Sequence, residues 1–294
     1  MKRNRMSPEP HPHTDTDTDT DEAGLGAAIA RAAELVRDAD ALLIGAGAGI
    51  GVDSGLPDFR GDQGFWRAYP PLAKLGIRFV EIANPRSFAQ HPELAWGFYG
   101  HRLALYRDTV PHEGFAILRE LGARLAQGAF VFTSNVDGQF RRAGFADDRL
   151  VECHGSIHHL QCSRPCVDAI WPADAVQPDI DPADCLMRPP LPTCPHCGAL
   201  ARPNVLMFND GRWVDGRTEA QYGRFETWLK KTRRLVVIEL GAGSDVPSVR
   251  RMCESRGAPL IRINPREPDV PEPGDVGIAA GALDTLQRLR KALR

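Results

Sequence analysis

The chain has 294 residues, of which 43% are hydrophobic and 25% are charged, a composition typical of a globular protein with a substantial buried core. Its 36 basic and 38 acidic residues nearly cancel, so no net charge favours nucleic acid or an anionic membrane as a partner. No apolar run approaches the ~20 residues of a membrane span, and the N-terminus lacks the apolar stretch of a secretory signal. We therefore expect a soluble, cytoplasmic protein, and the composition specifies no oligomeric state.

The first 22 residues are predicted to be a disordered tail. They contain no apolar cluster, and threonine alternates with aspartate from Thr14 to Asp21. Such a segment cannot bury enough apolar surface to offset the entropy that is lost on ordering.

Predicted strands and helices alternate through much of the remaining chain. Apolar residues recur at helical spacing over 26–38, and the apolar run 41–44 ends in glycines, as a buried strand entering a tight turn does. Further strands are predicted at 130–133, 235–238 and 260–263, and further helices at 112–126, 217–231, 246–256 and 280–293. This alternation predicts an α/β fold with a Rossmann-like, doubly wound parallel sheet. We expect that domain to comprise residues 23–61, 109–155 and 203–294.

Two stretches interrupt this alternation. Residues 62–108 carry aromatics and helical spacing without a clear strand, and residues 156–202 are rich in proline and hold five of the seven cysteines. We expect both to be insertions that together form a smaller domain. Because ligands of open α/β folds bind beyond the carboxyl ends of the strands, the site is expected between the sheet and these insertions.

A glycine-rich turn follows the first predicted strand. It reads Gly45-Ala46-Gly47-Ala48-Gly49-Ile50-Gly51, and its missing side chains would let backbone N–H groups approach a phosphate at a helix N-terminus. The strict GxGxxG spacing and the Walker lysine motif are both absent. Taken alone, the turn also fits a tight strand-to-helix connection without a ligand.

Three later segments make the pattern specific. The glycine turn is followed by Ser54-Gly55-Leu56-Pro57-Asp58-Phe59-Arg60, the second predicted strand by Ser134-Asn135-Val136-Asp137-Gly138, and Leu150-Val151-Glu152-Cys153 by His154-Gly155. With Thr133, these segments resemble the sirtuin family, whose signature is a GAG turn and SGIPDFR, then TQNIDGL, then an HG pair. Counting back from Arg60 aligns the GAG turn with residues 47–49. The resemblance covers about residues 26–290.

This resemblance implies an NAD-dependent protein-lysine deacylase that releases nicotinamide and O-acyl-ADP-ribose. It implies His154 as the base that removes a ribose hydroxyl proton at neutral pH, and Asn135 with Asp137 as the pocket for the nicotinamide carboxamide. The catalytic residues are then His154, Asn135 and Asp137. The cofactor-binding positions implied by the family are Gly47, Ala48, Gly49, Asp58, Phe59, Arg60, Asn135, Asp137, Gly241, Gly243, Ser244, Asn264 and Ala282.

The implied partner is an extended acyl-lysine segment of a protein or peptide. The run from Arg202 to Phe208 resembles the family segment to which the substrate adds as an extra strand, with Val205, Leu206 and Phe208 as substrate-binding residues. In sirtuins that prefer negatively charged acyl groups, a Tyr-x-x-Arg pair clasps the distal carboxylate, and Tyr99 with Arg102 matches it. These two residues share one face of a helix, and arginine binds a carboxylate bidentately. The alternative is an arginine on a solvated helix face.

Two close cysteine pairs predict a metal site. Cys162 and Cys166 precede Cys194 and Cys197 by a loop, which is typical of tetrahedral four-cysteine zinc sites. Four thiolates leave no position for a catalytic water, so one structural Zn²⁺ is expected. The alternatives are four unrelated buried thiols, or His196 in place of one ligand. The remaining Cys153, Cys185 and Cys253 are expected to serve packing, although Cys153 adjoins His154 and a reactive thiol there is an alternative.

Several positions depart from the family pattern. Gly51 stands for a serine, Ser134 for a glutamine, Ala242-Gly243 for Thr-Ser, and Asn209-Asp210 for Gly-Glu. Each lost hydrogen bond to NAD would cost about 0.5–1.5 kcal/mol, which predicts weakened NAD binding. Two other functions stay open at this point: transfer of ADP-ribose to a protein or to water, and a sensor that binds NAD or ADP-ribose without turnover.

Overall fold

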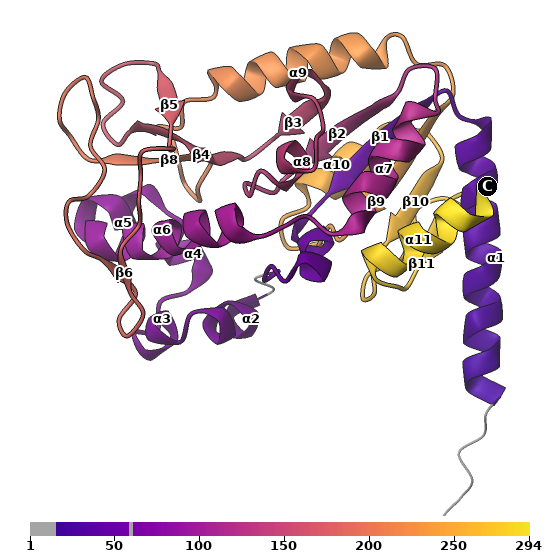
Figure 1. The fold of residues 1–294 in the computed structure, drawn as a ribbon, viewed down its shortest axis with the longest axis horizontal. Coiled ribbons are helices and arrows are strands. Elements are labelled where there is room, and N and C mark those ends of the chain that lie inside the picture. Colours follow the sequence, from indigo (N-terminus) through magenta and orange to yellow (C-terminus); the bar gives the residue numbers. More distant parts are fainter. Residues whose placement is uncertain (1–15, 59–60) are drawn as a thin grey trace, which may run out of the picture.

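A parallel sheet forms the centre of the larger part of the molecule. The computed structural model describes residues 16–58 and 61–294 (Figure 1). Its six-stranded sheet has the order β11-β10-β9-β1-β2-β3, and all neighbouring strands are parallel. The strands are β1 (Ala41–Ala46), β2 (Ala129–Thr133), β3 (Leu150–Glu152), β9 (Leu235–Leu240), β10 (Leu260–Ile263) and β11 (Val276–Ile278). The predicted doubly wound α/β fold is confirmed.

Helices cover both faces of this sheet because its buried strands alternate their side chains. Leu42 and Ile44 pack towards α1 (Thr16–Asp38), α7 (Glu113–Ala123) and α11 (Ala282–Ala292), whereas Leu43 packs towards α9 (Gly216–Leu229) and α10 (Ser248–Glu254). Short helical turns lie at Ala48–Ser54, Gln139–Arg142 (α8) and Asp147–Arg149. The strand order reverses between β1 and β9, where open α/β sheets bind their ligands.

The first helix begins earlier than the sequence predicted. α1 starts at Thr16, so it extends into the stretch 1–22 that was expected to be disordered, and residues 1–15 lie outside the described part. Buried Ile29, Ala33 and Val36 anchor its second half on the sheet, and helix extension from an anchored segment adds one hydrogen bond per residue. No helix within residues 16–58 or 61–294 is long and apolar enough to cross a membrane.

The second part of the molecule lies beside the carboxyl ends of the strands (Figure 1). Its helices are α2 (Gly61–Ala68), α3 (Pro70–Lys74), α4 (Phe79–Ile82), α5 (Pro85–Gln90) and α6 (Pro92–Asp108). An antiparallel sheet combines β5 (Ile170–Pro172), β4 (Gly155–Cys162) and β8 (Ala201–Val205), and β6 (Ile180–Asp181) pairs with β7 (Leu186–Met187). Residues 203–205, which the sequence analysis assigned to the Rossmann-like domain, thus belong to this second sheet, because their strand pairs with β4.

A buried ion pair joins two central strands. The guanidinium of Arg262 on β10 lies 2.6 Å from the Glu239 carboxylate on β9, and both side chains are almost fully buried. Glu254 of α10 contacts the same guanidinium at 2.6 Å. Because a buried charge without its partner is strongly unfavourable, the pair constrains both the strands and α10.

We predict that Arg262→Ala lowers the free energy of unfolding by about 3–5 kcal/mol, since Glu239 would be left buried and unpaired. The matched control is Arg188→Ala, because Arg188 forms ion pairs with Asp179 and Asp181 while its side chain is 56% exposed. The control should keep the wild-type midpoint, since solvent screens exposed pairs. Urea denaturation followed by circular dichroism measures both, and equal midpoints for the two variants would contradict the prediction.

Candidate functional site

Two glycine turns meet at the point where the strand order reverses. The turn after β1 contains Gly47 and Gly49, and the turn after β9 contains Gly241. Gly49 N–H donates to the Gly241 carbonyl at 3.0 Å. A Cβ on Gly49 would lie 2.6 Å from Gly241 Cα, and a Cβ on Gly47 would lie 2.7 Å from Ala242 Cα. The glycines are therefore required by the contact between the turns, and Ala48 between them is exposed beside it.

The turn after β2 is fixed to the turn after β1. The Thr133 hydroxyl donates to the Ala46 carbonyl at 2.8 Å and accepts the Asn135 N–H at 3.0 Å. The Asn135 amide donates to the Gly47 carbonyl at 3.0 Å. Thr133, whose role the sequence analysis did not identify, therefore aligns Asn135 with the glycine turn.

Asp137 is a buried carboxylate on the same turn. Its side chain is 8% exposed, and its Oδ1 accepts the Gln139 N–H at 2.9 Å. Burial raises the pKa of Asp137 to about 6, although this hydrogen bond and the nearby Arg102 cation act in the opposite direction. The group is therefore mostly ionised at neutral pH and can accept hydrogen bonds from an amide.

His154 follows β3 and is half buried. Its Nε2 lies 3.2 Å from the hydroxyl of Ser248, the first residue of α10. Burial lowers the pKa of His154, and a hydrogen bond to the Ser134 backbone partly offsets this effect. Either ring nitrogen of a neutral histidine can be the acceptor, and Nε2 is the one that faces the Ser248 hydroxyl.

Helix α9 holds Glu152, which lies two positions before His154. Glu152 N–H donates to the Gln221 side chain at 3.1 Å, and the Thr218 hydroxyl donates to the Glu152 carbonyl at 3.2 Å. Arg217 completes the set with an ion pair to the buried Glu152 carboxylate. Three side chains of α9 therefore fix the end of β3 from which His154 projects.

The strand ends on the other side of the reversal carry further cofactor-binding positions that the family resemblance implies. Asn264 is fully buried and donates to the Ala242 carbonyl at 2.9 Å. Ser244 N–H donates to Glu267 at 3.1 Å. Gly243 is half buried, and Ala282 is buried at the start of α11.

The segment that follows the glycine turn is tied to the same region. Asp58 forms an ion pair with Arg266 at 2.7 Å, which joins the segment to the chain beyond β10. Phe59 and Arg60 lie outside the described residues. Among residues 16–58 and 61–294, the implied NAD positions thus gather at the carboxyl ends of the strands. This is the part of an open α/β fold that fits a dinucleotide.

The expected substrate segment is hydrogen-bonded to the catalytic turn. Leu206 N–H donates to the His154 carbonyl at 2.9 Å, and Phe208 N–H donates to Ala83 at 3.0 Å. Leu206 is 37% exposed, Phe208 is half buried, and Val205 is buried at the end of β8. The N–H groups of Leu206 and Phe208 are therefore bonded within the chain, and the exposed Leu206 side chain offers apolar surface directly beside His154.

The turn after this segment explains two departures from the family pattern. Asn209 has a φ of 56°, a left-handed conformation that asparagine tolerates better than most residues other than glycine. Asp210 forms a fully buried ion pair with Arg202 at 2.8 Å. The two substitutions are thus compatible with a tight turn that is closed by a buried charge pair.

Arg102 lies in an aromatic cluster on α6. It is only 8% exposed, which excludes the alternative of a solvated helix face. Its guanidinium carbon lies 5.2 to 5.7 Å from the ring centres of Phe98, Tyr99 and Tyr106, and its Nε donates to the Tyr106 hydroxyl at 2.9 Å. The sequence analysis missed Tyr106, although its spacing of four residues from Arg102 places both on one helix face.

A cavity of about 500 Å³ opens at His154. Phe132, Cys153 and Leu206 are among the residues that line this cavity. Burial raises the pKa of the Cys153 thiol to about 12, so at neutral pH it is an unreactive thiol. The reactive-thiol alternative is therefore not favoured. Cys185 and Cys253 are both buried, as expected for packing residues.

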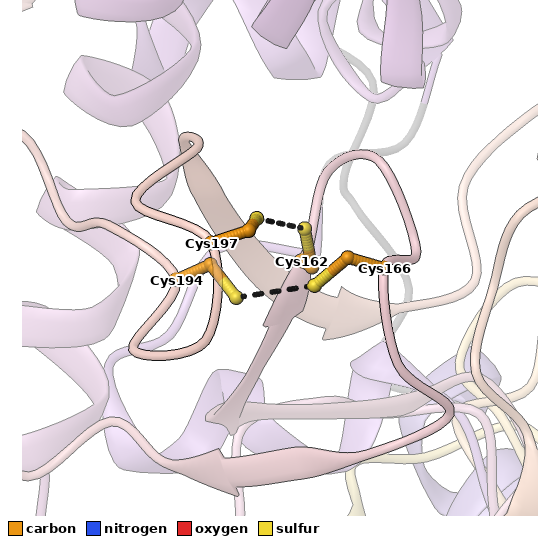
Figure 2. A group of neighbouring side chains, drawn as sticks. All are labelled: Cys162, Cys166, Cys194 and Cys197. Carbon is orange, nitrogen blue, oxygen red and sulfur yellow. Dashed lines mark hydrogen bonds between the residues drawn. The ribbon is translucent and has the colours of Figure 1, made fainter.

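The four predicted metal ligands lie together (Figure 2). Sγ of Cys162 lies 3.7 Å from that of Cys197, and the Cys166 to Cys194 distance is also 3.7 Å. A tetrahedron with Zn–S bonds of ~2.3 Å requires sulfurs ~3.8 Å apart, so the four thiols fit zinc. No histidine belongs to this cluster within the described part of the chain, so His196 is not a ligand in this arrangement.

Comparison with known proteins identifies the family. A profile of the Sir2 family matches residues 47–227. The NAD-dependent protein deacylase 1 of Archaeoglobus fulgidus is 32% identical over 253 residues, which cover 82% of this chain and 90% of that protein. The NAD-dependent protein deacylase of Aquifex aeolicus is 28% identical over 243 residues, 83% and 91% of the two chains.

Solved structures give the same result. A Sir2 homologue mutant in complex with ADP-ribose has a TM-score of 0.66 and 26% identity, with 89% of this chain and 96% of that chain covered. A Sir2 homologue in complex with NAD has a TM-score of 0.64 and 25% identity, with 90% and 94% covered. Sequence motifs, fold and relatives thus agree, and this chain belongs to the Sir2 family.

Proposed function

We propose that the chain is an NAD-dependent protein-lysine deacylase. The observation that carries this proposal is the direct hydrogen bond between the His154 carbonyl and Leu206 N–H, because it places a histidine base beside the partly exposed segment that follows β8. The same turn region holds Asn135 and Asp137 at neighbouring strand ends. A base, an amide pocket and a peptide-binding edge are the groups that this reaction requires.

When bound, NAD supplies the ribose carbon and the nicotinamide leaving group, so that acyl transfer yields lysine, nicotinamide and O-acyl-ADP-ribose. The contribution of the chain is orientation and proton transfer. Asp137 accepts hydrogen bonds through its buried carboxylate, and Asn135 is held by the Gly47 carbonyl. These two residues are proposed to hold the carboxamide of nicotinamide.

His154 is proposed as the general base that takes a ribose hydroxyl proton. Because burial lowers its pKa, the ring is neutral at pH 7 and can accept the proton at Nε2. The Ser248 hydroxyl contacts this nitrogen and orients the ring. The contacts from α9 to Glu152 hold the end of β3 and thereby limit the movement of the turn that carries His154.

Arg102 is proposed to recognise the distal carboxylate of an acidic acyl group such as succinyl. Its guanidinium is buried among aromatic rings, and its Nε donates to the Tyr106 hydroxyl. A buried cation of this kind gains more from an incoming carboxylate than an exposed one does. Tyr99 on the same helix face stays part of the proposed pair, and Tyr106 is added as the residue that holds Arg102.

The first prediction concerns His154→Ala. Loss of the base should lower kcat for NAD-dependent deacetylation by about 100-fold or more, because general base catalysis contributes about 10² to 10⁴. The test incubates wild type and variant with NAD and an acetyl-lysine peptide, and identifies the products by mass spectrometry. Lysine peptide with O-acyl-ADP-ribose is expected from the wild type alone.

The products of this incubation also distinguish the deacylase from the other candidate functions. ADP-ribose attached to protein or released by water would replace the deacylase by a transferase or hydrolase, and NAD binding without nicotinamide release would indicate a sensor. In the pH profile of the wild type, activity should be lost on acidification only below the ordinary histidine pKa of about 6.5, because burial lowers the pKa of His154. An acidic limb above that value would contradict the assignment.

The second prediction concerns Arg102→Met. The variant should lose most activity on a succinyl-lysine peptide while it keeps activity on the matched acetyl-lysine peptide, since only the succinyl group needs the cation. Tyr106→Phe, which removes the hydroxyl that accepts from Arg102 Nε, should give a smaller loss in the same direction. Steady-state kinetics on both peptides measure this, and equal losses on the two substrates would overturn the role of Arg102.

The third prediction concerns zinc. The purified chain should contain one zinc per molecule by atomic spectrometry, held by the four cysteines. Cys166→Ser and Cys197→Ser should lower both zinc content and thermal midpoint, because these sites contribute folding free energy. Cys185→Ser, which lies outside the cluster, is the control for zinc content. A full zinc content in the double variant Cys166→Ser/Cys197→Ser would sink the assignment.

A further inference from the structure

The cavity at His154 extends along one face of α10. Ser248, Arg251, Met252 and Ser255 all line it, and their spacing of three and four residues places them on a single helix face. The opposite face of this helix, with Val249 and Cys253, is buried against the sheet. From Ser248, which contacts the proposed base, to the C-cap Ser255, the lining residues thus span about 10 Å of helix.

The lining combines apolar side chains with one charged group. Phe132, Leu206 and Met252 are apolar, and Tyr222 of α9 lies among the lining residues. Arg251 is exposed, and it is the only permanently charged side chain among the lining residues. No carboxylate of the described residues forms an ion pair with it, whereas the neighbouring Arg250 is paired with Glu267. An occupant with an apolar stem and a terminal carboxylate would match both parts of the cavity.

The geometry of an extended peptide identifies the position of that occupant. In a strand, side chains at positions i and i+2 point to the same side and lie ~6.6 Å apart, whereas the side chain at i+1 points away. A substrate strand that pairs along residues 205–208 and presents its acyl-lysine to His154 therefore directs the residue two positions away into the same cavity. The ~6.6 Å between the two substrate side chains is shorter than the ~10 Å face of α10. The side chain two positions from the acyl-lysine therefore reaches the region of Arg251.

We propose that this cavity is a specificity subsite for the substrate residue two positions from the acyl-lysine, and that Arg251 selects a glutamate or aspartate there. The proposal rests on the deacylase function proposed above, because it takes the peptide to bind along residues 205–208. It adds a substrate class, namely lysines with an acidic residue two positions away.

The test uses acetyl-lysine peptides that carry glutamate, glutamine or lysine at a single flanking position, either two residues or one residue from the acetyl-lysine. At one of the two positions that lie two residues away, glutamate should lower KM about tenfold relative to lysine, since attraction and repulsion of an exposed charge add in this comparison. kcat should stay constant, because uniform binding does not alter the chemical step. Substitutions one residue away should have no such effect.

Arg251→Glu should reverse the preference, so that lysine has the lower KM at the same position. Arg233→Glu is the control, because Arg233 is an exposed arginine at the amino end of β9, away from the cavity. Thermal midpoints of both variants verify folding. A preference that is absent, or that survives Arg251→Glu unchanged, overturns the subsite.

Binding of the same peptides, labelled and measured by fluorescence anisotropy without NAD, separates this proposal from the deacylase function. If no peptide is turned over but the glutamate peptide binds more tightly and Arg251→Glu reverses the order, the deacylase function fails and the subsite stands. If peptides are turned over with equal KM and equal affinity, the subsite fails and the function stands.

Discussion

The contact between the two glycine turns is the constraint on which the rest of the site depends. Gly49 and Gly241 approach so closely that a Cβ on either would lie within about 2.6 Å of the other turn's backbone. Because this contact joins the ends of β1 and β9, it fixes the crevice at which the strand order reverses. Thr133 and Asn135 then attach the end of β2 to the same turn. The two glycine turns are therefore joined by backbone contacts, whereas the side chains of Thr133 and Asn135 attach the end of β2 to them.

The sequence predicted the parts of the fold that have strong local signals. Buried central strands contain continuous apolar runs, such as 41–44 in β1 and 235–238 in β9, and amphipathic helices such as α7 and α11 show clear spacing. Zinc ligands were also predictable, because a tight cysteine pair is a local pattern whose meaning depends little on the rest of the chain. His154 was predictable only from the order of the family motifs, since one histidine carries no signal of its own.

Other features depend on contacts that no local pattern encodes. β3 and β11 have only three residues each, too few for periodicity to identify a strand. Ser248 contacts His154 across 94 residues of sequence. The burial of Arg102 depends on how α6 packs in the fold. Gly47 and Gly49 have a second requirement of this kind. Their absent Cβ atoms make room for Gly241 and Ala242, a contact that the sequence analysis did not predict.

In the proposed function, His154 acts through two different groups. Its ring contacts the Ser248 hydroxyl, while its carbonyl accepts Leu206 N–H from the proposed substrate segment. A peptide that adds to residues 205–208 therefore shares a hydrogen-bonded ladder with the base. Since any shift of the ladder also shifts the ring, correct peptide alignment and correct base position are coupled by one backbone bond. In the proposed subsite, a flanking side chain in the cavity along α10 would act on the same segment, so sequence selectivity and alignment of the acyl-lysine would arise from one set of contacts.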